Sequence, residues 1–163
     1  VLRDGGVTRL VTHFNHPSEV TQAAERAISL LRNADIELRN QAVLLKRVND
    51  DPGVLAALYS RLDMLGVSPY YLHHLDAAPG THHFRVSLED GLAIYRAACA
   101  RMVTDALPVY VLDLPGGFGK VPIDSAAFER LDTRGHYAAI SPVTGRRVTW
   151  TDPALRIALA EGC

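Results

Sequence analysis

The sequence predicts an α/β protein in which a parallel sheet is followed by a small antiparallel hairpin. Two observations predict this fold class. Runs rich in β-branched and aromatic residues alternate three times with amphipathic helical runs before Lys120. Beyond Lys120 the helical periodicity stops, and two short β-like runs flank a proline and glycine turn. Because strand, helix and strand in series form a right-handed crossover, the first part is expected to be one parallel sheet.

Four strands are predicted, and each is a mainly apolar run bounded by turn residues. The first covers residues 7–15, VTRLVTHFN, and the second covers 36–45, IELRNQAVLL. The third covers 67–76, VSPYYLHHLD, and the fourth covers 107–113, LPVYVLD. Neighbouring side chains in a strand point to opposite faces, so the adjacent tyrosines and the adjacent histidines of the third strand are expected to face apart.

Three helices are predicted between these strands. A Pro-Ser pair opens the first, at residues 16–35, which has an alanine, isoleucine and leucine stripe. An Asp-Pro-Gly turn opens the second, at 49–65, and Gly66 is expected to cap its end. The third covers 87–106. After these elements, residues 135–153 predict a β-hairpin whose turn is Pro142–Gly145.

Composition narrows the class of protein. The 163 residues carry a net charge of −1, and 48% are apolar and 21% charged, as in an ordinary globular domain. No basic patch points to nucleic acid or to an anionic membrane, and no apolar run approaches the roughly 20 residues that span a bilayer. Cys99 and Cys163 lie far apart. A structural disulfide is therefore not expected. The absence of one fits a reducing compartment, so we expect a cytoplasmic location.

Polar residues gather near the ends of the predicted strands, where active sites of parallel α/β proteins form. For the first strand, the plain interpretation is a satisfied polar network around His13 and Asn15. The third strand ends in Asp76 and the fourth in Asp113. Two such aspartates serve as an acid and base pair, a metal site or a clamp on an ammonium group. Metal is disfavoured because the neighbouring histidines are expected to face apart.

The glycine turn in YVLDLPGGFGK, residues 110–120, raises the question of a phosphate loop. That template requires Ser or Thr after the lysine and glycine five positions before the last glycine, and the sequence has Val121 and Leu114 there. The phosphate loop is therefore excluded. Two interpretations of Lys120 stay open: a surface lysine after a flexible turn, or a Schiff-base lysine whose glycines allow a carbonyl partner to approach the backbone.

Four motifs together resemble one family in order and spacing: THFNHPSEVT, NQAVLLKRVNDD, VSPYYLHHLDAAPGTHHFRV and VYVLDLPGGFGKVPI. They are similar to the carboxyl-terminal part of the lysine 2,3-aminomutase family, over residues 7–153. The resemblance implies a partial (β/α) barrel of the radical S-adenosylmethionine type, of which the chain holds only the carboxyl-terminal strands and helices. It implies a barrel part at 1–113, and a cofactor-lysine turn with a carboxyl-terminal β segment at 114–163.

The family resemblance also implies a reaction and its cofactors. In the family, a 4Fe-4S cluster cleaves S-adenosylmethionine, and the radical formed acts on lysine held by pyridoxal phosphate; migration of the amino group yields β-lysine. By position, Lys120 is similar to the lysine that forms the pyridoxal phosphate aldimine. Asp76 and Asp113 are similar to the carboxylates that hold the ε-ammonium of the substrate. His13 and Gln41 correspond to residues on the S-adenosylmethionine side.

The chain also departs from the family. The cluster motif C-x-x-x-C-x-x-C is absent, and neither Cys99 nor Cys163 replaces it. We expect the cluster ligands upstream, and we expect the chain, which begins at Val1, to be an inactive fragment by itself. Phe118 replaces a residue that is often glycine in the family. Because an incomplete barrel exposes sheet edges, we expect a homo-oligomer. The family resemblance implies that the substrate is a small amino acid.

Alternative functions stay open from the sequence. A related aminomutase would act on arginine, on glutamate, or on lysine for modification of a translation elongation factor. Asp113 argues against glutamate, since a distal carboxylate would meet a like charge. A different alternative is a degenerate domain that binds a ligand without catalysis, because the cluster cysteines are missing.

Overall fold

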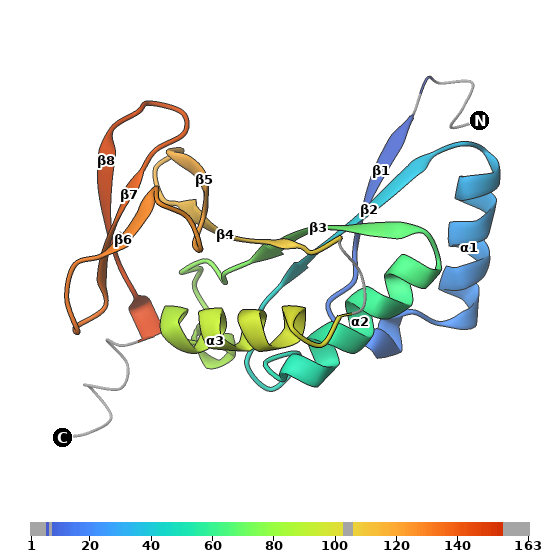
Figure 1. Cartoon of the computed structure of the whole chain (residues 1–163), viewed down its shortest axis with the longest axis horizontal. Helices are drawn as coiled ribbons and strands as arrows, with labels where there is room; N and C mark the ends of the chain where they lie inside the picture. The colour runs from blue at the N-terminus through green and yellow to red at the C-terminus, as the bar shows by residue number, and fades with distance from the viewer. Residues whose placement is uncertain (1–5, 7, 103–105, 155–163) are drawn as a thin grey trace.

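The computed structural model describes residue 6, residues 8–102 and residues 106–154 (Figure 1). Its main sheet has the order β1-β2-β3-β4-β5, in which the first four strands are parallel and the last is antiparallel. These strands are β1 (Arg9–His13), β2 (Glu37–Val43), β3 (Val67–His73), β4 (Val109–Leu114) and β5 (Gly119–Pro122). The predicted α/β class and its parallel sheet are confirmed, whereas β5 was not expected.

The described helices lie on one face of the sheet and do not cover the other. They are α1 (Gln22–Asn33), α2 (Pro52–Met64) and α3 (Leu88–Cys99), with short 3-10 turns η1 (Pro17–Glu19) and η2 (His82–Phe84). Figure 1 shows α2 and α3 along the lower face of the sheet. Apolar side chains fill the space between, with Leu55, Leu58 and Leu62 of α2 fully buried in one cluster with Leu38 and Leu72 of the sheet. The upper face is left for other contacts.

The first predicted helix, 16–35, is wrong at its amino-terminal end. The chain makes the 3-10 turn η1 first, and the α-helix begins only at Gln22. The cause is local capping, since the hydroxyl of Thr21 accepts the backbone N–H of Ala24. His16 and Glu19 form a separate capping box around η1. The segment that the apolar periodicity predicts as one helix is therefore divided into two, because η1 and α1 each have their own amino-terminal cap.

Two other elements end earlier than expected. The predicted third strand, 67–76, stops at His73, so Asp76 lies in the loop that follows. The third helix ends at Cys99 rather than at residue 106, and residues 103–105 lie outside the described residues. The second helix matches its prediction closely, with Asp51 as the cap that accepts two backbone N–H groups.

A bulge between β2 and β3 changes the orientation of the tyrosine pair. Asn40 pairs with Pro69, while Gln41 pairs with Tyr71, so the register skips Tyr70. The rings of Tyr70 and Tyr71 lie in contact, with centroids 3.9 Å apart. The expectation that the two tyrosines face apart is therefore wrong, because the extra residue breaks the strand alternation.

A second sheet follows the first and contains three antiparallel strands, β6 (Phe128–Arg130), β7 (His136–Ile140) and β8 (Arg147–Thr151). The hairpin predicted at 135–153 is confirmed as β7 and β8, whereas β6 was not expected. The predicted turn at Pro142–Gly145 is also confirmed, and Gly145 has φ +69°, a conformation that favours glycine. None of the helices in 8–102 and 106–154 is long and apolar enough to cross a bilayer.

Asp152 fastens the end of the second sheet to α3. Its side chain is fully buried, and Oδ2 accepts the backbone N–H of Leu88 at 2.7 Å, where α3 begins. Oδ1 accepts the N–H of Ala154 at 2.8 Å, and the backbone N–H of Asp152 donates to the carbonyl of Gly135. One carboxylate therefore satisfies two backbone donors that otherwise have no helical partner.

We expect the substitution Asp152→Ala to lower the free energy of unfolding by about 2–3 kcal/mol, because a buried N–H loses a charged acceptor. Asp152→Asn retains one acceptor oxygen and is expected to lose less. Urea denaturation followed by the fluorescence of Trp150 measures both changes. An alanine variant as stable as the parent would contradict this role for Asp152.

The histidine pair at the end of β3, His73 and His74, divides between the two faces of the sheet, as expected. His73 contacts Asp113, whereas His74 is buried on the other side and accepts the hydroxyl of Tyr110 at Nδ1, 2.8 Å away. Burial lowers the pKa of His74 to about 4. His74 is therefore a neutral core residue at neutral pH.

This burial of His74 makes stability depend on pH. The unfolded chain protonates His74 near pH 6.5 and the folded chain only near pH 4, so stability is full above pH 6.5 and falls as pH drops toward 4. The expected loss is roughly 3 kcal/mol. Urea denaturation across this range checks it, with Trp150 as the probe since its ring lies 5.8 Å from that of His74. His74→Asn keeps an acceptor but does not titrate, and an unchanged pH profile in that variant would refute the assignment.

Candidate functional site

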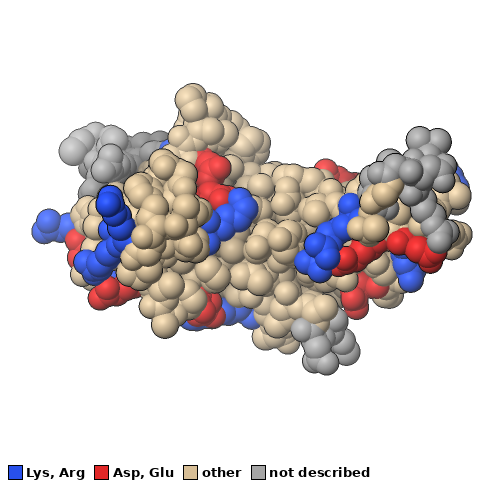
Figure 2. All heavy atoms as spheres, turned by 90° about the horizontal axis from the view of Figure 1, so that it is seen from above, with Lys and Arg blue, Asp and Glu red and all other residues tan. Residues whose placement is uncertain are grey.

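The predicted site residues of the first two strands lie on the helix-free face of the sheet. Along β2, positions 38, 40 and 42 are buried, and the odd positions are at least partly exposed. His13 pairs with Gln41 in register, and Gln41 pairs with Tyr71. Paired residues of parallel strands point to the same face, so these three side chains form a row across β1, β2 and β3. Figure 2 looks onto the side away from α2 and α3, where charged groups are separated by uncharged surface.

The glycine turn joins β4 and β5 as a hairpin. Asp113 and Lys120 are direct partners across this hairpin, and Nζ of Lys120 lies 2.6 Å from Oδ1 of Asp113. The turn depends on its glycines, since Gly116, Gly117 and Gly119 have φ of +83°, +78° and +90°. The stretch is therefore a tight turn that places a lysine against the aspartate seven residues before it.

The second sheet supports this turn from outside. The hydroxyl of Ser141 donates to the carbonyl of Phe118 at 2.7 Å. A Cβ at Gly119 would lie 2.9 Å from side-chain carbons of Pro142 and Val143, so the β7–β8 turn packs directly on this glycine. The bond from Ser141 holds the backbone of Phe118, the position at which the motif resemblance implies that glycine is frequent.

Asp113 has a second partner that sequence reasoning did not find. Nδ1 of His73 donates to Oδ2 of Asp113 at 3.0 Å, and the two side chains are 13% and 31% exposed. Burial is the largest effect on His73 and lowers its pKa, while the hydrogen bond to Asp113 acts in the opposite direction. His73 shares strand parity with Tyr71, which is a sequence signal for the same face, but its contact with β4 depends on register.

Asp76 and Asp113 share one cavity, although Asp76 comes from a loop rather than from the strand end predicted for it. The cavity has a volume of about 370 Å³, and Leu112 and Trp150 also line it. Partial burial raises the pKa of Asp76, and the negative charge of Asp113 raises it further. The two carboxylates therefore interact, as a two-carboxylate clamp on a cation requires.

The polar residues around the end of β1 form a structural network. Oδ1 of Asn15 accepts the backbone N–H of Val43, and Nδ2 of Asn49 donates to the carbonyl of Asn15. Oδ1 of Asn40 accepts the N–H of Phe14 at 2.8 Å. The satisfied-network interpretation is thus confirmed for Asn15. The amides of Asn15, Asn40 and Asn49 hold the strand ends together.

The described residues offer no ligand set for an iron–sulfur cluster. Cys99 is the one cysteine among them, and it lies partly buried in α3, where burial raises the pKa of its thiol. Cys163 lies outside the described residues. Within residues 8–102 and 106–154, no three histidine, cysteine or acidic side chains group as metal ligands.

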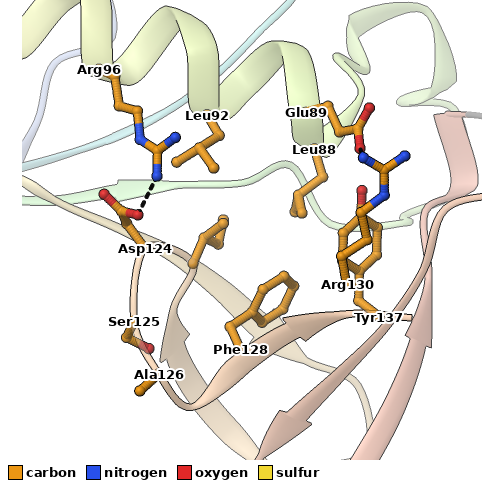
Figure 3. A pocket seen from close by; sticks show the side chains of 11 residues that line it. Leu88, Glu89, Leu92, Arg96, Asp124, Ser125, Ala126, Phe128, Arg130 and Tyr137 are labelled. Carbon is orange, nitrogen blue, oxygen red and sulfur yellow. Dashed lines mark hydrogen bonds and ion pairs between the residues drawn. The ribbon is translucent and has the colours of Figure 1, made fainter. Parts of the chain in front are cut away.

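A second cavity, of about 440 Å³, lies between α3 and the second sheet (Figure 3). Ion pairs between Arg96 and Asp124 and between Arg130 and Glu89 flank it. Its other lining side chains are mainly apolar: Leu88, Leu92, Ile123, Phe128 and the ring of Tyr137. Its arginines are already paired with carboxylates, whereas Asp76 and Asp113, two of the residues implied for chemistry, line the cavity of about 370 Å³ instead. The candidate site therefore comprises Asp76 and Asp113, which share that cavity, and Lys120, which contacts Asp113.

Comparison with known proteins supports the motif resemblance. No family model matches the chain. The L-lysine 2,3-aminomutase of Methanococcus maripaludis is 43% identical over 112 residues, which cover 69% of this chain and 26% of the relative. That of Fusobacterium nucleatum is 36% identical over 144 residues, covering 88% of this chain and 33% of the relative. A glutamate 2,3-aminomutase of Clostridioides difficile is 40% identical over 112 residues, covering 69% and 26%.

The chain thus spans between about a quarter and a third of the length of these relatives. The matches cover most of this chain. They include relatives named as lysine aminomutases and one named as a glutamate aminomutase. Lys120 and Asp113, which both belong to one of the resembling motifs, lie 2.6 Å apart. The chain belongs to the lysine 2,3-aminomutase family.

Proposed function

We propose that the protein carrying this chain is an isomerase that converts L-lysine to β-lysine by migration of the amino group from carbon 2 to carbon 3. One observation carries the choice of substrate. Asp113 binds the ε-ammonium of Lys120 at 2.6 Å, and that group is chemically identical to the distal end of a free lysine. Asp76 lines the same cavity. The site therefore already holds an alkylammonium group of the kind that the substrate would bring.

Lys120 fits the requirement for a pyridoxal phosphate lysine. Its side chain is 44% exposed on the hairpin, and the turn before it has glycines at 116, 117 and 119, so a flat ring can approach the backbone closely. When bound, pyridoxal phosphate supplies an aldehyde that condenses with a primary amine and a conjugated ring that delocalises an unpaired electron. Oδ1 of Asp113 is positioned to accept the proton that the Lys120 ammonium loses before Nζ becomes a nucleophile, and release of that proton to solvent returns Asp113 to its charged form.

Asp113 and Asp76 then serve the substrate. Once Nζ of Lys120 has given up its charge, Oδ1 of Asp113 is free to accept a hydrogen bond from the distal ammonium of lysine. Two carboxylates on one cation give charge-assisted bonds that fix the position of the substrate. A distal carboxylate would meet like charges here, which favours lysine over glutamate even though a glutamate aminomutase is among the relatives.

For S-adenosylmethionine, we propose that His13 and Gln41 contribute to its side of the site, since they are paired on the helix-free face. The five-stranded sheet would then be part of a partial (β/α) barrel of the radical S-adenosylmethionine type, with this face turned inward. The 4Fe-4S cluster does not fit the described residues. Its ligands are proposed to lie in the part of the relatives that this chain does not cover.

We further propose a cytoplasmic enzyme that assembles as a homo-oligomer and binds neither nucleic acid nor membrane. In this chain taken without the rest of such a barrel, Val11 and Val109 are 43% and 41% exposed, and β1 is an edge strand of the sheet among the described residues. Such surfaces favour association. The chain expressed by itself is therefore expected to sediment as dimers or larger species in analytical ultracentrifugation, and a monodisperse monomer would contradict this.

The test of the function uses the complete protein. It is incubated without oxygen with S-adenosylmethionine, pyridoxal phosphate and a reductant, in separate reactions with lysine, arginine and glutamate. Mass spectrometry of derivatised products is expected to find β-lysine as the main product. Turnover of arginine or glutamate with no β-lysine would overturn the substrate assignment.

A further inference from the structure

The carboxylate of Asp113 has two oxygens with two different partners. Oδ1 faces the ammonium of Lys120 on the exposed side, at 2.6 Å, and Oδ2 faces Nδ1 of His73 on the more buried side, at 3.0 Å. A carboxylate with a single partner rotates and exchanges its oxygens. Because His73 holds Oδ2, Oδ1 is the oxygen turned toward the exposed side, where the cation of Lys120 lies.

The fold places these groups on three adjacent strands. His73 ends β3 and pairs with Val111 of β4, so Asp113 lies two residues further along the same face. Lys120 approaches from β5. His73 is 13% exposed against 44% for Lys120, so the histidine has little freedom to move away while the lysine has room to leave. The histidine is a fixed partner of Asp113, and the cation is the exchangeable one.

The charge of His73 fits this role. Burial is the largest effect on the histidine and lowers its pKa, so the ring is neutral at neutral pH and acts as a hydrogen-bond donor without a positive charge. A cation in its place would neutralise Asp113 and weaken the attraction for a substrate ammonium. A neutral donor orients the carboxylate and leaves its negative charge for the ligand.

We propose that His73 is a positioning residue for the alkylammonium site: its Nδ1–H fixes Asp113 so that Oδ1 receives the distal ammonium of the amino acid substrate. This inference rests on the proposed function, because that function supplies the ammonium. It concerns substrate binding rather than the migration step. Loss of His73 is therefore expected to raise the KM for lysine and to change kcat much less.

The test measures binding without either cofactor, so that it does not depend on turnover. The complete protein with Lys120→Ala leaves Oδ1 of Asp113 without its lysine partner, and pentylamine serves as the probe in isothermal titration calorimetry. Adding His73→Phe is expected to weaken binding of pentylamine by roughly tenfold to a hundredfold, the usual worth of a hydrogen bond to a charged group. Adding His73→Asn is expected to restore most of the affinity, because the Asn amide places an N–H near the position of Nδ1.

A matched control comes from the second sheet, where His136 makes the same kind of contact with Asp132, at 2.7 Å. Adding His136→Phe removes an equivalent histidine–aspartate pair away from the site and is expected to leave pentylamine binding unchanged. If His73→Phe binds pentylamine as well as the Lys120→Ala parent, or if His73→Asn is as weak as His73→Phe, the positioning role is overturned and the proposed function stands. If the Lys120→Ala parent binds no pentylamine, the ammonium site itself fails, and both proposals fall together.

Discussion

Replacing Lys120 with alanine is expected to lower kcat for β-lysine formation by roughly a thousandfold or more, because a covalent attachment point for the cofactor is lost. Lys120 is one of two lysines in the sequence, and its amine lies on the helix-free face beside the glycine turn. The backbone at Gly117 is open, since a Cβ built there meets no atom of the described residues within 4 Å. The measurement is the turnover of lysine together with the visible absorbance of protein-bound pyridoxal phosphate.

The sequence provides a matched control for this change. Lys46, the other lysine, is exposed in the loop after β2, and its backbone N–H donates to the carbonyl of Phe84. Because Lys46→Ala keeps that backbone bond, it is expected to preserve both turnover and absorbance. An enzyme that keeps its absorbance band and its activity after Lys120→Ala would remove Lys120 from the role.

The second large effect is expected from Asp113→Asn, which should raise the KM for lysine by about a hundredfold. The amide has nearly the same shape and still accepts from His73, but it presents an uncharged group to the substrate ammonium and loses a charge-assisted bond. Steady-state kinetics over a wide range of lysine concentration measures this change. The discrimination between lysine and its uncharged analogue norleucine is expected to shrink in the same variant.

Asp76→Asn serves as the companion variant. Its carboxylate belongs to a loop and is more exposed than that of Asp113, so a smaller rise in KM is expected. Unchanged KM values for lysine in both variants would show that the two carboxylates do not bind the substrate. An unchanged preference for lysine over norleucine would lead to the same conclusion.

Much of the fold could be predicted from local patterns. The alternation of strand and helix indicated a parallel sheet, and the Pro142–Gly145 turn indicated the last hairpin. The errors lie where local capping or an extra residue overrides periodicity. Thr21 starts α1 later than the apolar stripe suggests, and the bulge at Tyr70 reverses the expected alternation. Neither β5 nor β6 has enough residues for a periodic signal.

By itself, the sequence determined the residue types available for chemistry: a lysine after a flexible glycine turn, and aspartates in or just after neighbouring strands. It excluded a phosphate loop, since that motif depends on residue identity at fixed spacing. Only the tertiary structure decided which of these groups meet. The β4–β5 hairpin brings Lys120 opposite Asp113, and the register of β3 against β4 adds His73. Register depends on contacts between strands distant in sequence, and local patterns do not encode it.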